Sequence, residues 1–271
     1  MLKWLLLVDR QSLPGSRNMA VDDILLRKVE RQEPLTVLRF YRWLRPTVSL
    51  GFYQDISRVV NLEFCTAGGI DIVRRPTGGK LVLHDREVTY AVASSDAGVF
   101  TETLRDSYRR ISLALVKGLE LMGLKARMAE SSPQEYVRGS MPCFAFPARD
   151  EVEVGGRKII GSAQKRSGRF FIQHGSIPLE TQTSLLAGVS ATNGGRAAAG
   201  GPGMTSIGEA LGRQVDFDWA VERLIRGFAE TFNVDFEPYA LEEREVALVE
   251  EVERTRYAAR DWTFLRRDAS G

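Results

Sequence analysis

Two side chains in this sequence, fifteen positions apart, could together carry out nucleophilic chemistry. Cys143 stands between Pro142 and Phe144, in a stretch without helix or strand periodicity, and its thiolate would attack a carbonyl carbon. Lys158 carries a cation that would lower the pKa of a nearby thiol. The residues alone leave other roles open. A lone cysteine is often a small buried apolar side chain, and Lys158 could instead pair with Glu153 across a hairpin.

A second candidate is the basic, glycine-rich turn at residues 74–80, Arg-Arg-Pro-Thr-Gly-Gly-Lys. The paired glycines Gly78 and Gly79 let backbone N–H groups approach a bound group closely, and three cations would attract an anion or a polar head group. The turn does not match a nucleotide-binding Walker loop, because Lys80 is followed by Leu81. The alternative is a basic β-turn that binds nothing.

The elements that must position these residues are mostly strands. Residues 70–93 are predicted to form three strands joined by the basic turn and a short second turn. Gly155-Gly156 predicts a tight hairpin over residues 151–160, with Glu153 opposite Lys158. The second hairpin strand should continue through residues 161–166, whose small side chains would let a ligand lie flat against the backbone. A further strand carries His174, whose role is either structural or functional.

Further strands are predicted at residues 5–8, 35–43 and 48–52, and apolar spacing predicts a helix over residues 103–122. We expect Asn18 and Asp218 to cap two other helices, with Asp22 and Asp23 near the N-terminal end of the first. A fourth helix is predicted over residues 241–257. The Gly/Ala-rich residues 191–205 predict a linker or a loop that orders on binding.

Composition limits the possible classes. The chain has 271 residues, a net charge of +2 and 44% hydrophobic residues, which is ordinary for a globular protein and argues against wholesale nucleic-acid binding. No apolar run approaches the roughly 20 residues of a membrane span, so no membrane partner is expected. The N-terminus reaches Asp9 too early for a signal peptide, which predicts a cytoplasmic protein with reduced thiols. Two cysteines and two histidines give no metal spacing, and Cys65 is expected to be inert.

Several collinear motifs together resemble the catalytic domain of the biotin/lipoate protein ligase and octanoyltransferase superfamily. They are NMAVD at 18–22, LRFYRWLRPTVSLGFYQ at 38–54, RRPTGG at 74–79 with His84-Asp85, GRKIIGSAQ at 156–164 and QHGSI at 173–177. The resemblance implies an α/β (α+β) fold with a large mixed β-sheet, a smaller sheet and flanking helices. It implies a single catalytic domain over residues 1–271, with its core at about 15–235 and a helical C-terminal tail.

Within the superfamily, the chain is most similar to octanoyltransferases of the LipM type, because Cys143-Phe144 and Lys158 stand where those enzymes place a nucleophile and a catalytic lysine. The resemblance implies a Cys143 acyl-thioester, with no cofactor and no metal. Lys80 departs from the third glycine that lipoate ligases often carry. The residues that the resemblance assigns to substrate binding are Arg75, Thr77, Gly78, Gly79, His84, Gly161, Ser162, Ala163, His174 and Gly175.

The partners implied are octanoyl-acyl carrier protein as donor and a lipoyl-domain protein, such as the glycine cleavage H protein, as acceptor. Both are typically acidic, so arginines could steer them, although a solvated basic face is the alternative. Two other functions stay open: an ATP-dependent lipoate-protein ligase core that needs a separate accessory chain, and a non-catalytic acyl-binding subunit. The arginines considered for steering are Arg39, Arg42, Arg45, Arg74 and Arg75.

Overall fold

The computed structural model describes residues 2–101, 103–130, 150–191 and 203–266. At its centre is a six-stranded sheet with the strand order β10-β11-β6-β2-β1-β12. The sheet is mixed, because β1 pairs in parallel with β2 and β12 while the remaining neighbours are antiparallel. Its strands are β1 (Leu2–Val8), β2 (Thr36–Tyr41), β6 (Glu87–Ser94), β10 (Gly161–Ser167), β11 (Phe170–Pro178) and β12 (Val234–Pro238).

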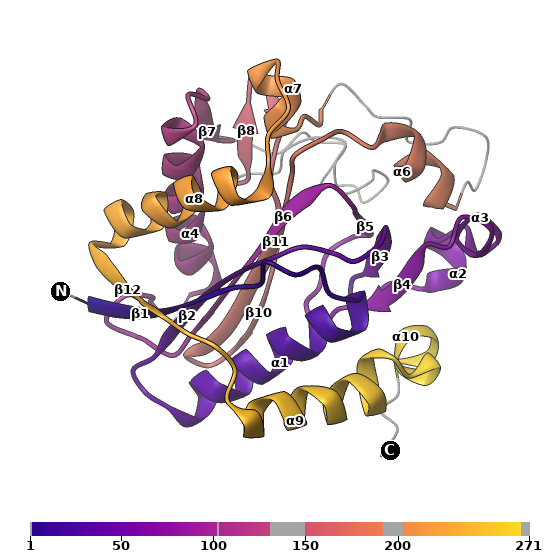
Figure 1. The fold of residues 1–271 in the computed structure, drawn as a ribbon, viewed down its shortest axis with the longest axis horizontal. Helices are drawn as coiled ribbons and strands as arrows, with labels where there is room; N and C mark the ends of the chain where they lie inside the picture. The colour runs from indigo at the N-terminus through magenta and orange to yellow at the C-terminus, as the bar shows by residue number, and fades with distance from the viewer. Residues whose placement is uncertain (1, 102, 131–149, 192–202, 267–271) are drawn as a thin grey trace.

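Helices cover both faces of this sheet (Figure 1). The helices α4 (Leu104–Leu121) and α8 (Phe217–Phe232) pack together on one face. On the other face lies α1 (Gly15–Arg31), against which α9 (Glu243–Val252) and the π-helical segment η1 (Glu253–Tyr257) pack. Both faces of β2 and β6 are therefore buried, which explains why every residue of these two strands is buried.

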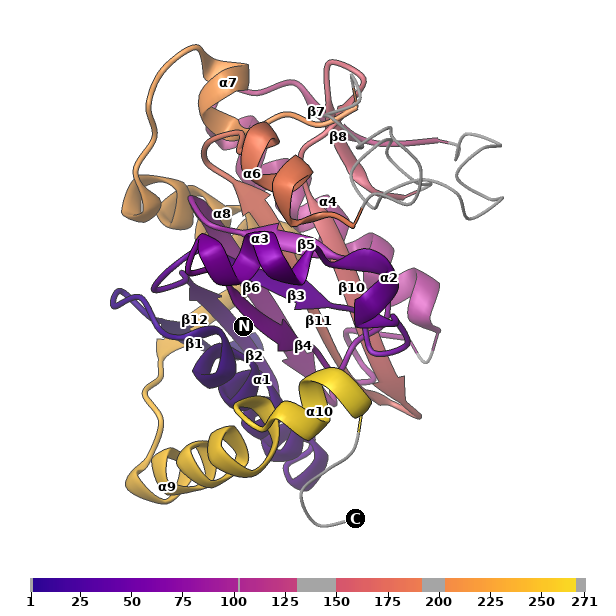
Figure 2. The ribbon, with the colours of Figure 1, turned by 90° about the vertical axis from the view of Figure 1, so that its right-hand side faces the viewer.

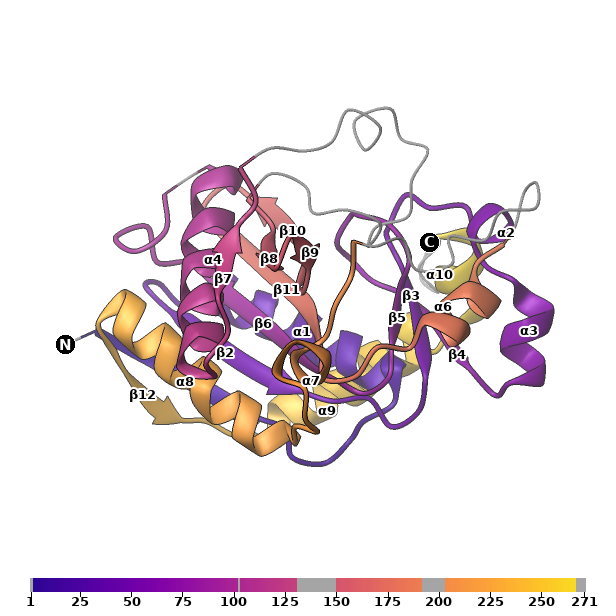
Figure 3. The ribbon, with the colours of Figure 1, turned by 90° about the horizontal axis from the view of Figure 1, so that it is seen from above.

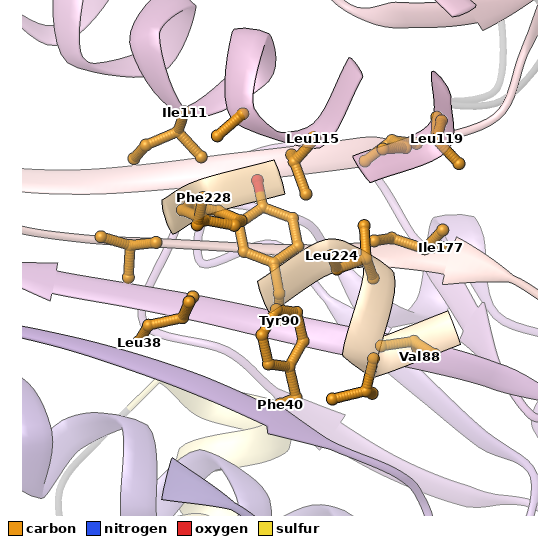
Figure 4. Close-up of a cluster of buried hydrophobic side chains, with 14 of the residues drawn as sticks. Leu38, Phe40, Val88, Tyr90, Ile111, Leu115, Leu119, Ile177, Leu224 and Phe228 are labelled. Atoms are coloured by element: carbon orange, nitrogen blue, oxygen red, sulfur yellow. The ribbon is translucent and has the colours of Figure 1, made fainter. Parts of the chain in front are cut away.

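The larger apolar core fills the space between the sheet and the helix pair α4 and α8. Figure 4 shows Ile111, Leu115 and Leu119 of α4 facing side chains of the sheet. The three residues recur at spacings of four along α4, as the sequence predicts for its buried face. Each buried side chain of this size stabilises the fold by roughly 1.5–3 kcal/mol relative to an exposed one. The side chains that they meet include Leu38, Phe40, Val88, Tyr90, Ile177, Leu224 and Phe228.

Two three-stranded sheets accompany the large one. The first has the order β4-β3-β5, from β3 (Thr47–Leu50), β4 (Asp71–Arg74) and β5 (Val82–His84), and lies with α2 (Ile56–Val59), α3 (Leu62–Ala67) and α6 (Thr183–Val189) (Figure 2). The second has the order β7-β8-β9, from β7 (Ala126–Met128), β8 (Val152–Val154) and β9 (Arg157–Lys158). The predicted fold class is confirmed, with two small sheets where one was expected. The short helices α7 (Ile207–Leu211) and α10 (Arg260–Leu265) complete the described elements.

The predicted hairpin is confirmed in its register but not in its continuation. Glu153 lies opposite Lys158, and Gly155 and Gly156 have φ of 59° and 77°, as a primed turn requires. The chain does not continue as one strand after the hairpin. Ile159 and Ile160 are buried between β9 and β10, so that β10 joins the large sheet while β9 stays in a small one.

Two predictions about helix caps are wrong. Helix α1 begins at Gly15 after Pro14, so Asn18 lies inside the helix and its side-chain amide donates to the carbonyls of Leu13 and Arg42. Asp216 caps α8 by accepting from the backbone N–H of Trp219, and Asp218 lies in the first turn. The fourth predicted helix, over residues 241–257, is helical over residues 243–257, where α9 is followed directly by the π-helical η1. Most of the predicted linker, residues 192–202, lies outside the described residues.

Candidate active site

A cavity lies where the large sheet meets the small sheet β4-β3-β5, with about 430 Å³ of empty space counted out to bulk solvent. Eight of the ten predicted substrate-binding residues line it: Arg75, Gly79, His84, Gly161, Ser162, Ala163, His174 and Gly175. The other two are beside it, since the Thr77 hydroxyl bonds His174 and the Gly78 carbonyl accepts from Arg75. The structure thus brings together segments about 100 residues apart in the sequence.

His174 is held between a carboxylate and a hydroxyl. Its Nδ1 lies 2.9 Å from Asp22 Oδ2, and its Nε2 lies 2.7 Å from Thr77 Oγ1. Because a carboxylate only accepts, Nδ1 carries the proton and donates to Asp22, which leaves Nε2 to accept from Thr77. Burial lowers the pKa of His174 despite its contact with Asp22, which favours the neutral ring. Helix α1 is therefore tied to the glycine-rich turn through this ring.

Asp22 is the shared acceptor beneath the cavity. Its carboxylate accepts from Arg39 at 2.7 Å and from the Tyr41 hydroxyl at 3.0 Å, as well as from His174. Burial alone would raise the pKa of Asp22, but the hydrogen bond from His174 and the charge of Arg39 hold it below its usual value. The sequence placed Asp22 near the N-terminal end of a helix. In the structure Asp22 is instead a buried anion in the middle of α1.

His84 is held in the same manner on the other wall. Its Nδ1 lies 2.8 Å from Glu87 Oε1, its Nε2 lies 2.7 Å from Ser49 Oγ, and its ring stacks on Trp43 with the centroids 4.0 Å apart. Ser49 Oγ also accepts from Arg75 Nη1 at 3.1 Å. The Glu87 carboxylate accepts further from Trp43 Nε1 and Ser176 Oγ. Both histidines are therefore fixed in one tautomer and orientation by hydrogen bonds on each ring nitrogen.

The two arginines of the glycine-rich turn donate hydrogen bonds to backbone carbonyls of the protein. Arg75 donates to the carbonyls of Ser49, Gly78 and Lys80, so its guanidinium holds the turn closed. Arg74 donates to the carbonyls of Gly51, Phe52, Gln54 and Thr263 and is 1% exposed. A guanidinium that donates to several carbonyls satisfies backbone groups of the protein itself. These two cations thus have a structural role that the sequence did not reveal.

Burial limits which of the five arginines can meet a partner directly at the surface. Arg39, Arg74 and Arg75 are all at most 5% exposed, so they cannot contact an acidic partner at the surface. Arg42 is half-buried with its guanidinium over the Phe217 ring. Arg45 is exposed and lies 3.7 Å from Asp71. Of the five arginines, only Arg45 is exposed, and it forms an ion pair with Asp71.

Lys158 is fully buried, and its Nζ donates to Glu151 Oε1 at 2.7 Å. The alternative pairing of Lys158 with Glu153 is not formed, and Glu153 accepts from Arg127 Nε at 2.7 Å. Glu153 and Lys158 are thus directly opposite in the hairpin but do not form an ion pair. Lys158 instead contacts Glu151, two residues before Glu153. Cys143 lies outside the described residues, so its distance from Lys158 stays a prediction.

Sequence reasoning missed seven residues of the cavity wall, most of them within or beside the motifs that carry the resemblance. Polar side chains at alternate positions of β6 and β11 could have indicated that Thr89 and Ser176 line a site. The two residues are paired across these strands, so they lie on the same face of the sheet. Met19 lies within the motif at 18–22, but nothing about a methionine indicates a ligand contact. The missed residues are Met19, Tyr41, Trp43, Ser49, Val82, Thr89 and Ser176.

The described residues contain no group of three or more histidine, cysteine, aspartate or glutamate side chains that could hold a metal ion. Nor does any helix within them have the length and apolar character needed to cross a bilayer. The ring nitrogens of His84 and His174 contact carboxylates and hydroxyls of the protein.

Comparison with known families gives a match over most of the chain. Residues 14–229 match the family model of the lipoyl protein ligase A/B catalytic domain. An octanoyltransferase LipM of Moorella thermoacetica is 38% identical over 255 residues, which cover 90% of this chain and 92% of that protein. The octanoyltransferase LipM of Geobacillus kaustophilus is 36% identical over 271 residues, which cover 96% of this chain and 97% of its own.

Solved structures show the same fold. A bi-partite lipoate protein ligase from Thermoplasma acidophilum superposes with a TM-score of 0.80 at 24% identity, over 97% of each chain. A lipoate-protein ligase A bound with ATP superposes with a TM-score of 0.81 at 24% identity, over 97% of this chain and 99% of its own. At this level of identity, the likeness establishes the fold alone.

Proposed function

The chain belongs to the family of lipoyl protein ligase A/B catalytic domains, and on that premise we propose that it is an octanoyltransferase that acts in lipoate biosynthesis. The observation that carries the proposal is its identity of 36–38% to two octanoyltransferases over at least 90% of both chains. The family likeness makes it an acyltransferase. The donor is octanoyl-acyl carrier protein, and the acceptor is a lysine of a lipoyl domain, such as that of the glycine cleavage H protein.

The cavity supports an acyl substrate. Its wall combines apolar side chains, such as Met19 and Val82, with the backbone of β10 and β11, and both of its histidines already bond carboxylates of the protein. Gly161 and Gly175 contribute backbone to this wall, and a Cβ on Gly175 would lie 2.6 Å from Tyr90 Cε1 and 2.8 Å from the carbonyl oxygen of Gly161, so the close packing of the two strands requires glycine there. An octanoyl chain carries no polar atom beyond its carbonyl, so a wall whose polar groups are already hydrogen-bonded suits it.

The reaction that we propose has two steps. The Cys143 thiolate attacks the carbonyl carbon of the octanoyl thioester, a new C–S bond forms, and the thiolate of the donor leaves. The neutral amine of the acceptor lysine then attacks the octanoyl-enzyme, so that the C–N bond forms, the C–S bond breaks, and the Cys143 thiolate is restored as the amine loses a proton. The first step exchanges thioesters and the second runs downhill to an amide, so neither needs ATP.

Lys158 would stabilise the Cys143 thiolate by its charge and give one proton to the thiolate of the donor as it leaves. As a neutral amine it would then accept the proton that the attacking amine loses. The Lys158 ammonium is buried and hydrogen-bonded to Glu151, so the protein holds it in a fixed position, as this role requires. The oxyanion would be bound by backbone N–H groups of β10 or of the glycine-rich turn. Within the described residues β10 is the edge strand of the large sheet, so it has a side without a strand partner.

Intact-mass measurement tests this function. The protein is mixed with octanoyl-acyl carrier protein without nucleotide, and an octanoyl group is expected on the peptide that contains Cys143. Cys143→Ser should abolish this adduct. Cys65→Ala is the matched control, because burial raises the pKa of the Cys65 thiol and makes it a poor nucleophile.

Two other outcomes would replace the proposal. Transfer that appears only with ATP and free lipoate, and that does not change with Cys143→Ser, would identify a ligase core. Octanoate binding without any covalent adduct or transfer would identify an acyl-binding subunit. Either result would exclude the cysteine-dependent mechanism.

A further inference from the structure

A second cleft lies beside the cavity described above, which we call the acyl cavity, and the proposed mechanism does not use this cleft. It is formed by the turn after β5, the segment that follows β11, and the helices α6 and α7. The three ribbon views agree in placing α6 next to β5 (Figures 1, 2 and 3). Its empty space, about 870 Å³ counted out to bulk solvent, is about twice that of the acyl cavity.

The cleft and the acyl cavity share a thin wall. On β5, Leu83 lines the cleft, while its neighbours Val82 and His84 line the cavity. Glu87 lines the cleft and at the same time bonds His84 and Ser176, which line the cavity. The cleft and the cavity are therefore neighbours across β5, and residues 157–161 run from one to the other, with Arg157 lining the cleft and Gly161 lining the cavity.

The lining of the cleft is more acidic than basic. Its two guanidiniums are each held by a carboxylate, since Arg86 lies 3.0 Å from Glu180 and Arg157 lies 2.6 Å from Glu209. Two carboxylates, Asp85 and Glu87, remain beyond these pairs. The charged residues of the cleft are thus Asp85, Glu87, Glu180, Glu209, Arg86 and Arg157.

Asp85 differs from the other carboxylates in lacking a partner. Within the described ranges, no hydrogen bond or ion pair reaches its side chain, although the residue is half-buried. Burial raises the pKa of Asp85, which reflects the cost of holding this charge partly out of water. A cation that entered the cleft would offset that cost.

A lysine side chain has the shape and charge that the cleft fits. Its four-carbon stem is apolar and its ammonium donates three hydrogen bonds. Leu83, Pro178, Leu186 and Met204 supply the apolar part of the wall, and Asp85 supplies the acceptor. The arm of an acyl carrier protein is a poorer match, because its phosphodiester would be repelled by the excess of carboxylates.

We propose that this cleft receives the acceptor lysine of the lipoyl domain and that Asp85 binds its ammonium. The ammonium then loses one proton to solvent water and attacks the octanoyl-enzyme as a neutral amine. The inference rests on the proposed function and adds the entry site of the second substrate. The position of the cleft supports it. Arg157 and Met204 both line the cleft. Arg157 directly precedes Lys158 in the chain, and the backbone of Met204 pairs with that of Lys158 in an isolated parallel β-bridge.

The test separates the two half-reactions in the intact enzyme. Asp85→Asn should form the octanoyl-enzyme from octanoyl-acyl carrier protein at the wild-type rate. Its transfer to the lipoyl domain, and to Nα-acetyl-lysine amide, should fall about tenfold in kcat/KM through a higher KM, because a charged hydrogen bond is lost. Asp235→Asn, an exposed carboxylate on β12, is the matched control and should change neither step.

Hydroxylamine distinguishes binding from distortion of the site. It is uncharged at neutral pH, so its attack on the octanoyl-enzyme should not change with Asp85→Asn. An equal loss with hydroxylamine and with the lysine amide would overturn the proposal, because the substitution would then have disturbed the site as a whole. Unchanged transfer to the lysine amide would also overturn it.

Direct binding tests the cleft even if the proposed function fails. If wild-type protein forms no octanoyl-enzyme, the proposed function is wrong, while the affinity for the lipoyl domain can still be measured. The cleft predicts that replacing the acceptor lysine by glutamine weakens binding to wild-type protein about tenfold, with no such difference for Asp85→Asn. Equal affinities of the two lipoyl domains for wild-type protein would rule out the cleft as the lysine site.

Discussion

The acyl cavity, lined by His84 and His174, and the second cleft, lined by Asp85, lie on opposite sides of β5. They differ in whether their polar side chains have hydrogen-bond partners within the protein. In the cavity, His84 and His174 each contact a carboxylate through one ring nitrogen and a hydroxyl through the other. In the cleft, the carboxylate of Asp85 has no such partner among the described residues. A site whose polar groups are satisfied internally suits an apolar ligand, whereas an unsatisfied carboxylate suits a cation.

The two regions also differ in how they are built. The wall of the cavity comes from strands of two sheets and from a turn that Arg75 closes through three backbone carbonyls. The cleft is built from a turn, short helices and ion pairs whose members are partly exposed. We infer that the cavity is rigid and selects the acyl group by shape, while the cleft recognises charge.

Lys158 stands in the chain between Arg157 of the cleft and Gly161 of the cavity, and its replacement should have the largest effect. Lys158→Met should lower octanoyl transfer by at least roughly 100-fold, because the acid–base group is lost. It should also lower the free energy of unfolding by about 3 kcal/mol, because Glu151 is left as a buried charge without this partner. Steady-state kinetics and urea unfolding measure the two effects.

The double variant Lys158→Met/Glu151→Gln is the control for folding. Removal of the second charge should restore much of the unfolding free energy while transfer stays low. Recovery of transfer together with stability would mean that Lys158 only holds the hairpin in place. The two regions would then have to act without a shared catalytic cation.

The rigidity of the cavity is tested by two glycines that differ in their surroundings. A Cβ on Gly51 would lie 2.0 Å from the carbonyl oxygen of Gly79, whereas one on Gly78 would meet nothing within 4 Å. Gly51→Ala should therefore lower the unfolding free energy by about 1–3 kcal/mol and slow octanoyl-enzyme formation. Gly78→Ala should change stability by less than about 0.5 kcal/mol. Equal stabilities of the two variants in urea unfolding would contradict a tightly closed turn.

The smallest expected effect is a dependence of stability on pH. The pKa of His174 is lower in the folded protein than its usual value of 6.5, so the unfolded chain binds more protons just below that pH. Stability should thus fall as the pH is lowered from about 6.5, by at most about 1.4 kcal/mol per pH unit from this group. Unfolding in urea at pH 7.5 and 5.5 measures the change.

His174→Gln should reduce this dependence, since it removes the group that titrates. A dependence of the same size in His174→Gln would show that another group is responsible. Because Asp22 has a pKa below its usual value of 3.8, its own contribution is lost only at lower pH and does not enter this comparison.

Much of the fold could be predicted from local pattern. Helix α4 was predicted over residues 103–122 and spans Leu104–Leu121, because its apolar spacing and the Thr103 cap act within a few turns. The Gly155-Gly156 turn and its register followed in the same manner. Predictions that depended on a single polar residue were less reliable, since Asn18 and Asp216 show that a cap depends on where the chain enters the helix.

In the candidate site, too, the positions of the motif residues could be predicted from the sequence, whereas the partners of the charged side chains could not. The motif positions Arg75, His84, Gly161–Ala163 and His174 were identified from the sequence, and the structure places them around one cavity. The fate of each charge was not predictable. Lys158 bonds Glu151 rather than Glu153, and Arg39 and Arg74 are buried, because burial depends on which distant segments pack over a side chain.

The amino-acid sequence alone determined the family, the strands and turns, and the short-range apolar patterns, since these depend on neighbours a few residues away. Only the tertiary structure decided that Asp22 and Glu87 fix the two histidines, and that Asp85 is left facing a cleft on the far side of the wall. The physical reason is that hydrogen bonds and desolvation act over a few ångströms in space. They join α1 to β11 across 152 positions of the chain, which no local pattern encodes.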